Sequence, residues 1–106
     1  MKQVLFLTIL FFSSQLYSQA TIKNLDATAF KKQVDGKKSI LIDLRTTKEI
    51  EAKGKIKGAK QIDFLDKNAE TIILKLDKNK SYLIYCAGGG RSGECAELML
   101  KTALNR

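Results

Sequence analysis

The sequence predicts a three-layer α/β fold, in which a mostly parallel central sheet is flanked by helices. Short apolar runs rich in isoleucine and leucine alternate with segments that open on helix-capping residues. The last of these runs leads directly into a glycine-rich loop and a final helix. The chain contains no internal repeat, no low-complexity stretch and no proline. Alternation of this kind implies right-handed crossovers and a sheet that is covered on both faces.

The first twenty residues have the layout of a secretory signal peptide. A lysine follows the initial methionine, and Val4–Phe12 is a nearly unbroken apolar run. A polar stretch then places the small residues Ser18 and Ala20 at the −3 and −1 positions of a cleavage site. We therefore expect residues 1–20 to be removed and residues 21–106 to form one mature domain.

The alternatives to a signal peptide are a membrane anchor and a buried first helix. The apolar run has about half of the roughly 20 residues that a membrane span requires, and no cysteine near the cleavage site could carry a lipid. We expect an exported protein, periplasmic or secreted, with no stable membrane anchor after cleavage.

The mature domain is expected to begin with a helix and a strand. Asp26 is a suitable N-cap for a helix that continues to about Val34, and Gly36 is a suitable stop. Ser39–Leu44 is a short apolar run that predicts a buried strand.

A second helix and a second strand follow. Thr46 or Thr47 caps a short helix over Lys48–Lys53, which ends at Gly54. Lys60–Phe64 is expected to form the next strand.

The third helix and third strand lead to the loop. In Asn68–Leu76, helical spacing places Ile72, Ile73 and Leu76 on one face. After a polar turn, Ser81–Tyr85 predicts a third strand.

The loop after this strand has the features of a cradle for a reactive thiolate. Cys86 lies at the carboxyl end of a strand, where α/β sheets bind ligands. The three glycines at positions 88–90 allow positive φ angles and inward-facing N–H groups, which form an anion-binding nest. Arg91 adds a fixed charge, and a helix over Ser92–Leu104 adds its positive end. Each feature lowers the pKa of a thiol at the centre. A buried cysteine and a tight glycine turn are each commonplace alone, but their combination here favours nucleophilic chemistry at sulfur.

Composition excludes several other functions. The chain has two cysteines and no histidine, which is half of a structural metal site, so we expect no metal and no cofactor. Its net charge of +8 becomes +7 without the lysine of the leader. The lysines are scattered and not interleaved with aromatic residues, which argues against nucleic-acid binding and leaves attraction of anionic substrates as a secondary interpretation.

Cys95 allows two interpretations. On the last helix it shares a face with Leu98 and Met99, so packing against the sheet is the main expectation. The alternative is a resolving thiol that attacks a persulfide on Cys86 or forms a disulfide with it.

Two blocks of sequence resemble the rhodanese-like sulfurtransferases. Residues 86–91 read Cys-x-x-Gly-x-Arg and are followed by Ser92, as in the active-site loop of single-domain members. Residues 41–45, Glu49 and residues 54–59 look like the family's Asp-x-Arg strand and its Gly-His-Ile-Pro-Gly-Ala turn. The resemblance covers almost the whole mature chain in the right order and implies a rhodanese-like fold.

The resemblance also implies a mechanism. Cys86 would take a sulfane sulfur from a small anionic donor such as thiosulfate, or from another persulfide, and pass it to cyanide or a thiol. Arg91 would hold the donor and act with Cys86 as a catalytic residue. The residues that would bind the substrate and cradle the persulfide are Ala87, Gly88, Gly89, Gly90 and Ser92.

Asp43 and Arg45 are expected to be structural residues near the site. They lie at the end of the first predicted strand, and Arg45 can pair with either Glu49 or Asp43. Loop length separates the chain from phosphatases and arsenate reductases on a similar scaffold. Four residues lie between Cys86 and Arg91 here, whereas such a phosphatase carries five to surround a tetrahedral oxyanion.

The chain departs from the family pattern in two places. Lys55-Ile56-Lys57 replaces His-Ile-Pro, although Gly54 and Gly58 should preserve the backbone path. Members usually continue past the last helix into a further strand and a tryptophan-containing segment, so we expect that strand to be missing and a sheet edge to be exposed. A non-catalytic binding or sulfur-carrier module and a truncated inactive product are the alternative functions.

Overall fold

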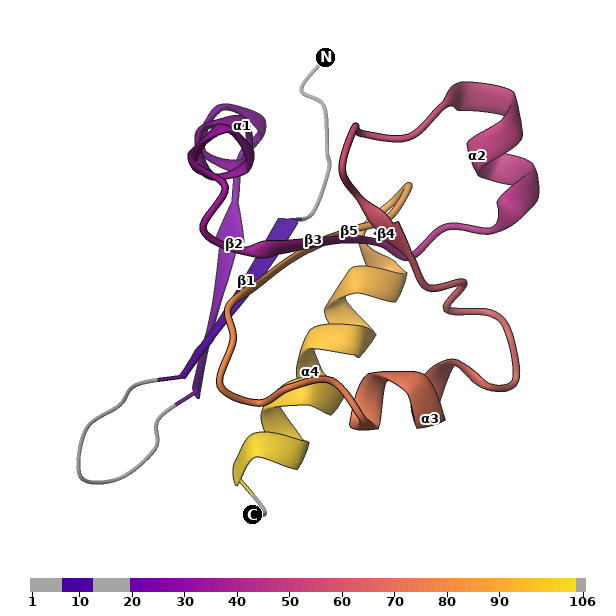
Figure 1. Cartoon of the computed structure of the whole chain (residues 1–106). Helices are drawn as coiled ribbons and strands as arrows, with labels where there is room; N and C mark the ends of the chain where they lie inside the picture. The colour runs from indigo at the N-terminus through magenta and orange to yellow at the C-terminus, as the bar shows by residue number, and fades with distance from the viewer. Residues whose placement is uncertain (1–6, 13–19, 105–106) are drawn as a thin grey trace.

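The computed structural model describes residues 7–12 and 20–104, which form a twisted sheet between two helical layers (Figure 1). The strands in this part of the chain are β1 (Leu7–Phe12), β2 (Ala20–Leu25), β3 (Ile40–Asp43), β4 (Lys60–Gln61) and β5 (Tyr82–Tyr85). The helices are α1 (Ala27–Gly36), α2 (Thr47–Lys53), α3 (Ala69–Leu74) and α4 (Gly90–Leu104). α1 and α2 lie on one side of the sheet, and α3 and α4 lie on the other.

The sheet has the strand order β2-β1-β5-β3-β4. β3 pairs in parallel with both β5 and β4, so that Ile42 lies beside Ile84 on one side and Lys60 on the other. β1 pairs antiparallel with β5 and with β2. Four strands therefore run in one direction and β1 runs against them, which confirms the predicted α/β class with a parallel core of three strands.

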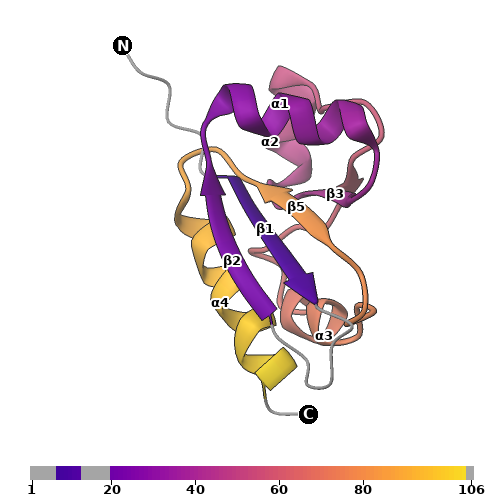
Figure 2. The same ribbon diagram turned by 90° about the vertical axis from the view of Figure 1, so that its left-hand side faces the viewer.

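Alternation along β3 and β5 divides the core between the two faces of the sheet. Leu41 and Leu83 belong to the cluster beneath α1, while Ile42 and Ile84 belong to the cluster against α3 and α4. Figure 2 shows α4 lying along β1 and β2, which it contacts. Each buried aliphatic side chain of this kind contributes roughly 1.5–3 kcal/mol, so the parallel strands are held from both sides.

Helix α1 begins as predicted and ends at Gly36, two residues after the predicted Val34. The Asp26 carboxylate accepts a hydrogen bond from Ala29 N at 2.8 Å. The helix includes Gly36 and is closed by Lys37, which takes the left-handed conformation with φ of 57°. The N–H of Lys37 then donates to the carbonyl of Val34. The prediction that Gly36 ends the helix was therefore wrong, because Lys37 adopts the left-handed conformation that ends it.

Helix α2 begins at Thr47, one residue before the predicted start, ends at Lys53 as predicted, and is capped by Thr46. The Thr46 side chain accepts from Glu49 N, and the Glu49 carboxylate accepts from Thr46 N, so both halves of a capping box are present. Gly54 caps the end of the helix, at the predicted stop.

β4 and α3 are clearly shorter than predicted, whereas β3 and β5 lose only end residues of the predicted strands. The predicted strand to Phe64 keeps regular pairing only over β4, although Ile62 N and Phe64 N still donate to the carbonyls of Asp43 and Leu44. Helix α3 spans only Ala69–Leu74.

The predicted apolar face of α3 is correct only in part. Ile73 is buried and Leu76 packs against the core, but Ile72 is 45% exposed. With a helix this short, Ile72 turns away from the sheet instead of sharing the face of its neighbour.

The two N-terminal strands were not expected from the sequence. β1 falls within the predicted signal peptide, while residues 1–6 and 13–19, including Ser18 of the predicted cleavage site, lie outside the described residues. β1 pairs with β5 on one side and β2 on the other. Among the helices that the structure describes, none has the length and apolar character to cross a membrane.

Candidate active site

The glycine-rich loop lies at the carboxyl end of the parallel strands, as the sequence predicted. Cys86 directly follows β5, and Leu44 N donates to the Tyr85 carbonyl at 2.9 Å, which fixes the end of β3 beside it. Helix α4 begins at Gly90, two residues before the predicted start at Ser92. The first turn of a 15-residue helix thus opens at the loop. The positive end of its dipole favours an anion there.

The sulfur of Cys86 is enclosed by hydrogen-bonding groups. Gly89 N donates to Sγ at 3.1 Å and Ser92 N donates at 3.3 Å. Ser92 Oγ lies 3.5 Å from Sγ and also donates to the Gly89 carbonyl at 3.2 Å. Cys86 is only 1% exposed. A reactant must therefore enter the loop to contact the sulfur.

These contacts set the protonation of the thiol. Burial raises the pKa of Cys86, but its hydrogen bond with the Ser92 side chain and those from the backbone N–H groups of Ser92, Gly89 and Arg91 outweigh the effect of burial. The net result is a pKa below the ordinary value of a thiol. The thiolate is the nucleophilic form of cysteine, so the loop is suited to hold a reactive sulfur.

One glycine of the three performs the backbone reversal. Gly89 has φ of 99°, a conformation that a residue with a side chain rarely adopts. It presents the N–H of Gly89 to the sulfur. Gly88 and Gly90 do not have positive φ, and Ala87, Gly88 and Gly90 are exposed around the rim of the loop.

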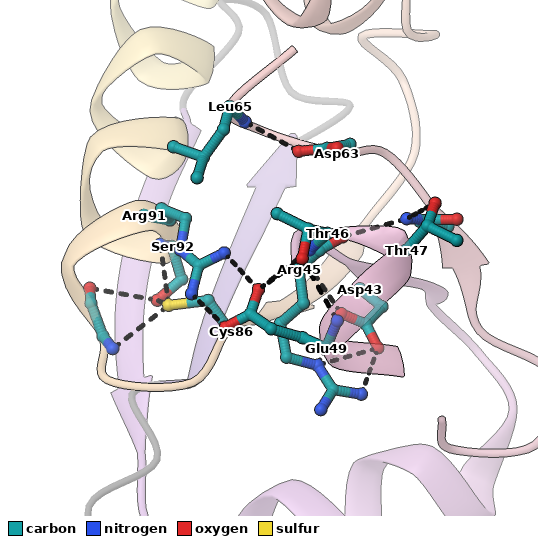
Figure 3. A network of polar contacts seen from close by, with 12 residues as sticks. Asp43, Arg45, Thr46, Thr47, Glu49, Asp63, Leu65, Cys86, Arg91 and Ser92 are labelled. Carbon is teal, nitrogen blue, oxygen red and sulfur yellow. Dashed lines mark hydrogen bonds and ion pairs between the residues drawn. The ribbon is translucent and has the colours of Figure 1, made fainter. Parts of the chain in front are cut away.

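Arg91 faces a carboxylate on α2. Its Nη1 and Nη2 donate to Glu49 Oε1 and Oε2 at 2.8 and 3.0 Å (Figure 3). Glu49 is held in turn by Thr46 through the capping box. Hydrogen bonding from Arg91 is the largest cause that lowers the pKa of Glu49 to about 2. The sequence assigned Arg91 to an anionic donor, whereas its guanidinium is here bonded in two places within the protein.

Glu49 is the site residue that the sequence assignment missed. It was identified in the family motif and as a possible partner of Arg45, but not as a partner of Arg91. Its position three residues after Thr46 marked the capping box. Its contact with α4 joins residues 42 positions apart, and no local pattern indicates it.

Arg45 pairs with Asp43 and not with Glu49. Its Nε and Nη2 donate to the Asp43 carboxylate at 3.0 and 2.7 Å, and Nη2 also donates to the Gly54 carbonyl at 2.7 Å. The guanidinium lies over the Tyr85 ring, 5.6 Å from its centroid. Burial raises the pKa of Asp43, but hydrogen bonds from Arg45 outweigh burial, so the pKa lies below its ordinary value. The pair ties the end of β3 to the end of α2.

Cys95 is packed in the core beneath the loop. It is 1% exposed, and its Sγ lies 3.8 Å from Met99 Sδ. Burial is the largest cause that raises its pKa to about 12, and the charge of Cys86 adds to it. Both cysteines are free thiols. These surroundings agree with the packing role and make Cys95 a poor nucleophile in the folded state.

A further cavity lies away from the loop. It has a volume of about 880 Å³ and lies between α1, β3 and the turn before β4, with Phe30, Val34 and Leu41 among its apolar lining residues. Cys86 does not line it. Within residues 7–12 and 20–104, no group of three or more histidine, cysteine or acidic side chains is placed to hold a metal ion.

The sequence of the chain also matches a protein-family model. The model described as rhodanese-like domain matches residues 26–105, well over half of the chain. The chain belongs to the rhodanese-like domain family. No curated protein and no solved structure gave a significant match. Within this rhodanese-like domain, the match spans both Cys86 with its loop and the Asp43–Arg45 turn.

Proposed function

We propose that this rhodanese-like domain is a sulfurtransferase that carries sulfane sulfur as a persulfide on Cys86. The observation that supports it most directly is the set of hydrogen bonds that Gly89 and Ser92 direct at Cys86 Sγ. Together with the start of α4, these donors favour a thiolate. They would also stabilise the negative outer sulfur of a persulfide. Membership of the family is compatible with this activity.

The first half-reaction loads the cysteine. The Cys86 thiolate attacks the outer sulfur of a donor, and a new S–S bond forms as the old one breaks. With thiosulfate, the electron pair of the broken bond leaves with sulfite. With a persulfide R–S–SH, it leaves with the thiolate RS⁻. Neither case calls for a histidine base, because the loop itself favours the thiolate form of Cys86.

The second half-reaction returns the thiolate. A thiophilic acceptor attacks the outer sulfur of the Cys86 persulfide, and the S–S electron pair stays on Cys86. Cyanide as acceptor gives thiocyanate, and an acceptor thiolate gives a new persulfide. Small sulfur compounds are thus the proposed partners, and nucleic acid is not among them.

Export is a separate part of the proposal. The apolar run Val4–Phe12 and the small residues at positions 18 and 20 support cleavage after Ala20. Residues Leu7–Phe12 form β1 in the full chain, so one molecule cannot both lose the leader and keep this strand. Intact mass of the protein recovered from the periplasm or medium tests this part, since a retained N-terminus would contradict it.

Sulfur loading tests the activity directly. The full chain is incubated with thiosulfate or with cysteine persulfide, and its intact mass is measured before and after addition of cyanide. We expect a gain of one sulfur atom that is lost as thiocyanate. Cys86→Ser should abolish the gain. Cys95→Ser should retain it, because Cys95 is packed in the core.

Two outcomes would count against the sulfurtransferase. A folded wild-type sample that gains no sulfur from either donor would favour a non-catalytic binding module. A gain that persists in Cys86→Ser would move the chemistry to another residue. Circular dichroism on each sample shows whether the comparison is made on folded protein.

A further inference from the structure

The two arginines of the site are each already paired with a carboxylate. Arg91 makes its two-point contact with Glu49, and Arg45 makes its contact with Asp43. Asp63 is close enough to Arg91 for its negative charge to raise the pKa of the guanidinium. Figure 3 shows the Arg91–Glu49 contact, which joins the start of α4 to α2.

The summed charge of these side chains is negative, whereas the net charge of the whole chain is positive. Arg91, Glu49 and Asp63 sum to −1, and the Cys86 thiolate, whose charge also acts on Arg91, brings the sum to −2. Asp43 and Arg45 neutralise each other and add nothing to it. The chain carries +8 overall. Its lysines lie at the surface and are almost all exposed, where salt screens their field over roughly 8 Å.

Resting on the sulfurtransferase function above, we infer that the Arg91–Glu49 pair makes this site select persulfides over thiosulfate as sulfur donors. Thiosulfate brings two negative charges to a nearly enclosed sulfur, beside carboxylates and an arginine that is already bound. A persulfide R–S–SH brings its outer sulfur with no charge when protonated. Like charges at short range and low exposure repel strongly, so the dianion is the disfavoured donor.

The loop itself offers nothing that offsets this repulsion with a side chain. Ala87, Gly88, Gly89 and Gly90 carry no charge. The N–H groups of Gly89 and Ser92 are directed at Sγ, where the transferred sulfur binds, and not at a sulfonate further out. The selection therefore depends on whether Glu49 keeps the charge of Arg91 occupied.

In the transfer, the Cys86 thiolate attacks the outer sulfur of R–S–SH. The S–S bond of the donor breaks, its electron pair leaves as RS⁻, and the proton stays on the outer sulfur or passes to water. The charge is −1 before and after the step. The same step with thiosulfate gathers a charge of −3 at the sulfur atoms.

The test compares loading rates of Cys86 from thiosulfate and from cysteine persulfide on the full chain, by quenched intact mass. Each rate is divided by that of the same donor with a free low-molecular-weight thiolate, which removes intrinsic reactivity. We expect wild type to favour cysteine persulfide by about tenfold or more. Glu49→Gln should shift this ratio about tenfold towards thiosulfate, because it frees Arg91 to bind the sulfonate. Because both donors are compared on the same variant, a general loss of loop order slows both loading rates and leaves their ratio unchanged.

Glu51→Gln is the matched control, since it removes the same charge from an exposed position on the same helix. It should leave the ratio unchanged. Equal normalised rates in wild type, or equal shifts in both variants, would overturn the inference while leaving the sulfurtransferase intact. Absence of loading from either donor would instead remove the proposed function and this inference with it.

Discussion

Ser92 supports the reactive sulfur in two ways. Its N–H donates to Cys86 Sγ, and its hydroxyl connects Sγ to the Gly89 carbonyl. The side chain is fully buried, so water cannot replace it without rearrangement of the loop. A hydrogen bond to a charged group in such a place is worth about 1.5–3 kcal/mol.

Ser92→Ala is therefore expected to raise the pKa of Cys86 and slow sulfur loading roughly tenfold at neutral pH. The rate of alkylation by iodoacetamide as a function of pH measures the pKa, and intact mass measures the loading. The matched control is Thr102→Ala, which removes a hydroxyl on the same helix that donates to the Leu98 carbonyl. An unchanged alkylation profile in Ser92→Ala would show that the backbone N–H groups suffice.

At this scale the sequence predicted the loop and missed its partner. The position of Cys86 at a strand end follows from local pattern, because β5 and α4 adjoin it in the chain. The partner of Arg91 does not follow, because the long side chain can reach several carboxylates and only the packed fold decides among them. For the same reason, the sequence could not decide whether Arg45 pairs with Asp43 or with Glu49.

The Arg91–Glu49 contact also has a structural role between elements. It joins the first turn of α4 to α2. Helix α2 has no buried residue of its own, so its capping box and this contact, together with the Arg45 bond to the Gly54 carbonyl, hold it in place.

The stability that this contact supplies should depend on pH. The pKa of Glu49 falls from 4.5 to about 2 in the folded state. A lowered pKa means that the contribution is fully present above about pH 4.5 and is lost as pH falls through about 2. The pair is partly exposed, so about 1 kcal/mol is the expected size. The free energies of unfolding of wild type and Glu49→Gln, measured in urea, should differ by this amount at roughly neutral pH and converge in acid. A difference that does not change with pH would contradict the assignment.

Helix α1 ends at a position where glycine is favoured and lysine is present. Lys37 has φ of 57°, which costs a residue with a side chain about 1 kcal/mol. Lys37→Gly should therefore raise the free energy of unfolding by roughly 0.5–1 kcal/mol. Lys38→Gly is the control, since it adds only flexibility to the unfolded chain and should be neutral or destabilising. A loss of stability in Lys37→Gly equal to that of the control would contradict the strained C-cap.

Elements with capping residues were the ones whose starts could be predicted. Asp26 and Thr46 determined the starts of α1 and α2 because a side chain beside the backbone satisfies the first N–H groups. Strand lengths were less predictable, since regular pairing depends on the neighbour. β4 pairs regularly with β3 over two residues only, after which the chain keeps single hydrogen bonds to it.

At the scale of the whole molecule, one segment has two possible uses. An apolar run near the N-terminus favours a signal peptide by composition, and the same run has the β-branched and aromatic residues of a strand. Which use applies depends on pairing with β5, whose residues lie 72 to 76 positions further along the chain, so local sequence could not decide it. In the structure this segment is β1, between β2 and β5.

The contribution of β1 to the fold leads to the last prediction. β1 pairs with β2 over six residue pairs and with β5 over three, and it contacts α4. Without it, β2 has no neighbour in the sheet and the edge of β5 is open. We expect residues 21–106 to melt more than roughly 10 °C below the full chain, because a loss of a few kcal/mol is large for so small a domain. A chain that begins at residue 7 keeps β1 and should melt like the full chain. If residues 21–106 melt cooperatively at the temperature of the full chain, β1 contributes nothing to stability, and removal of the leader leaves a complete domain.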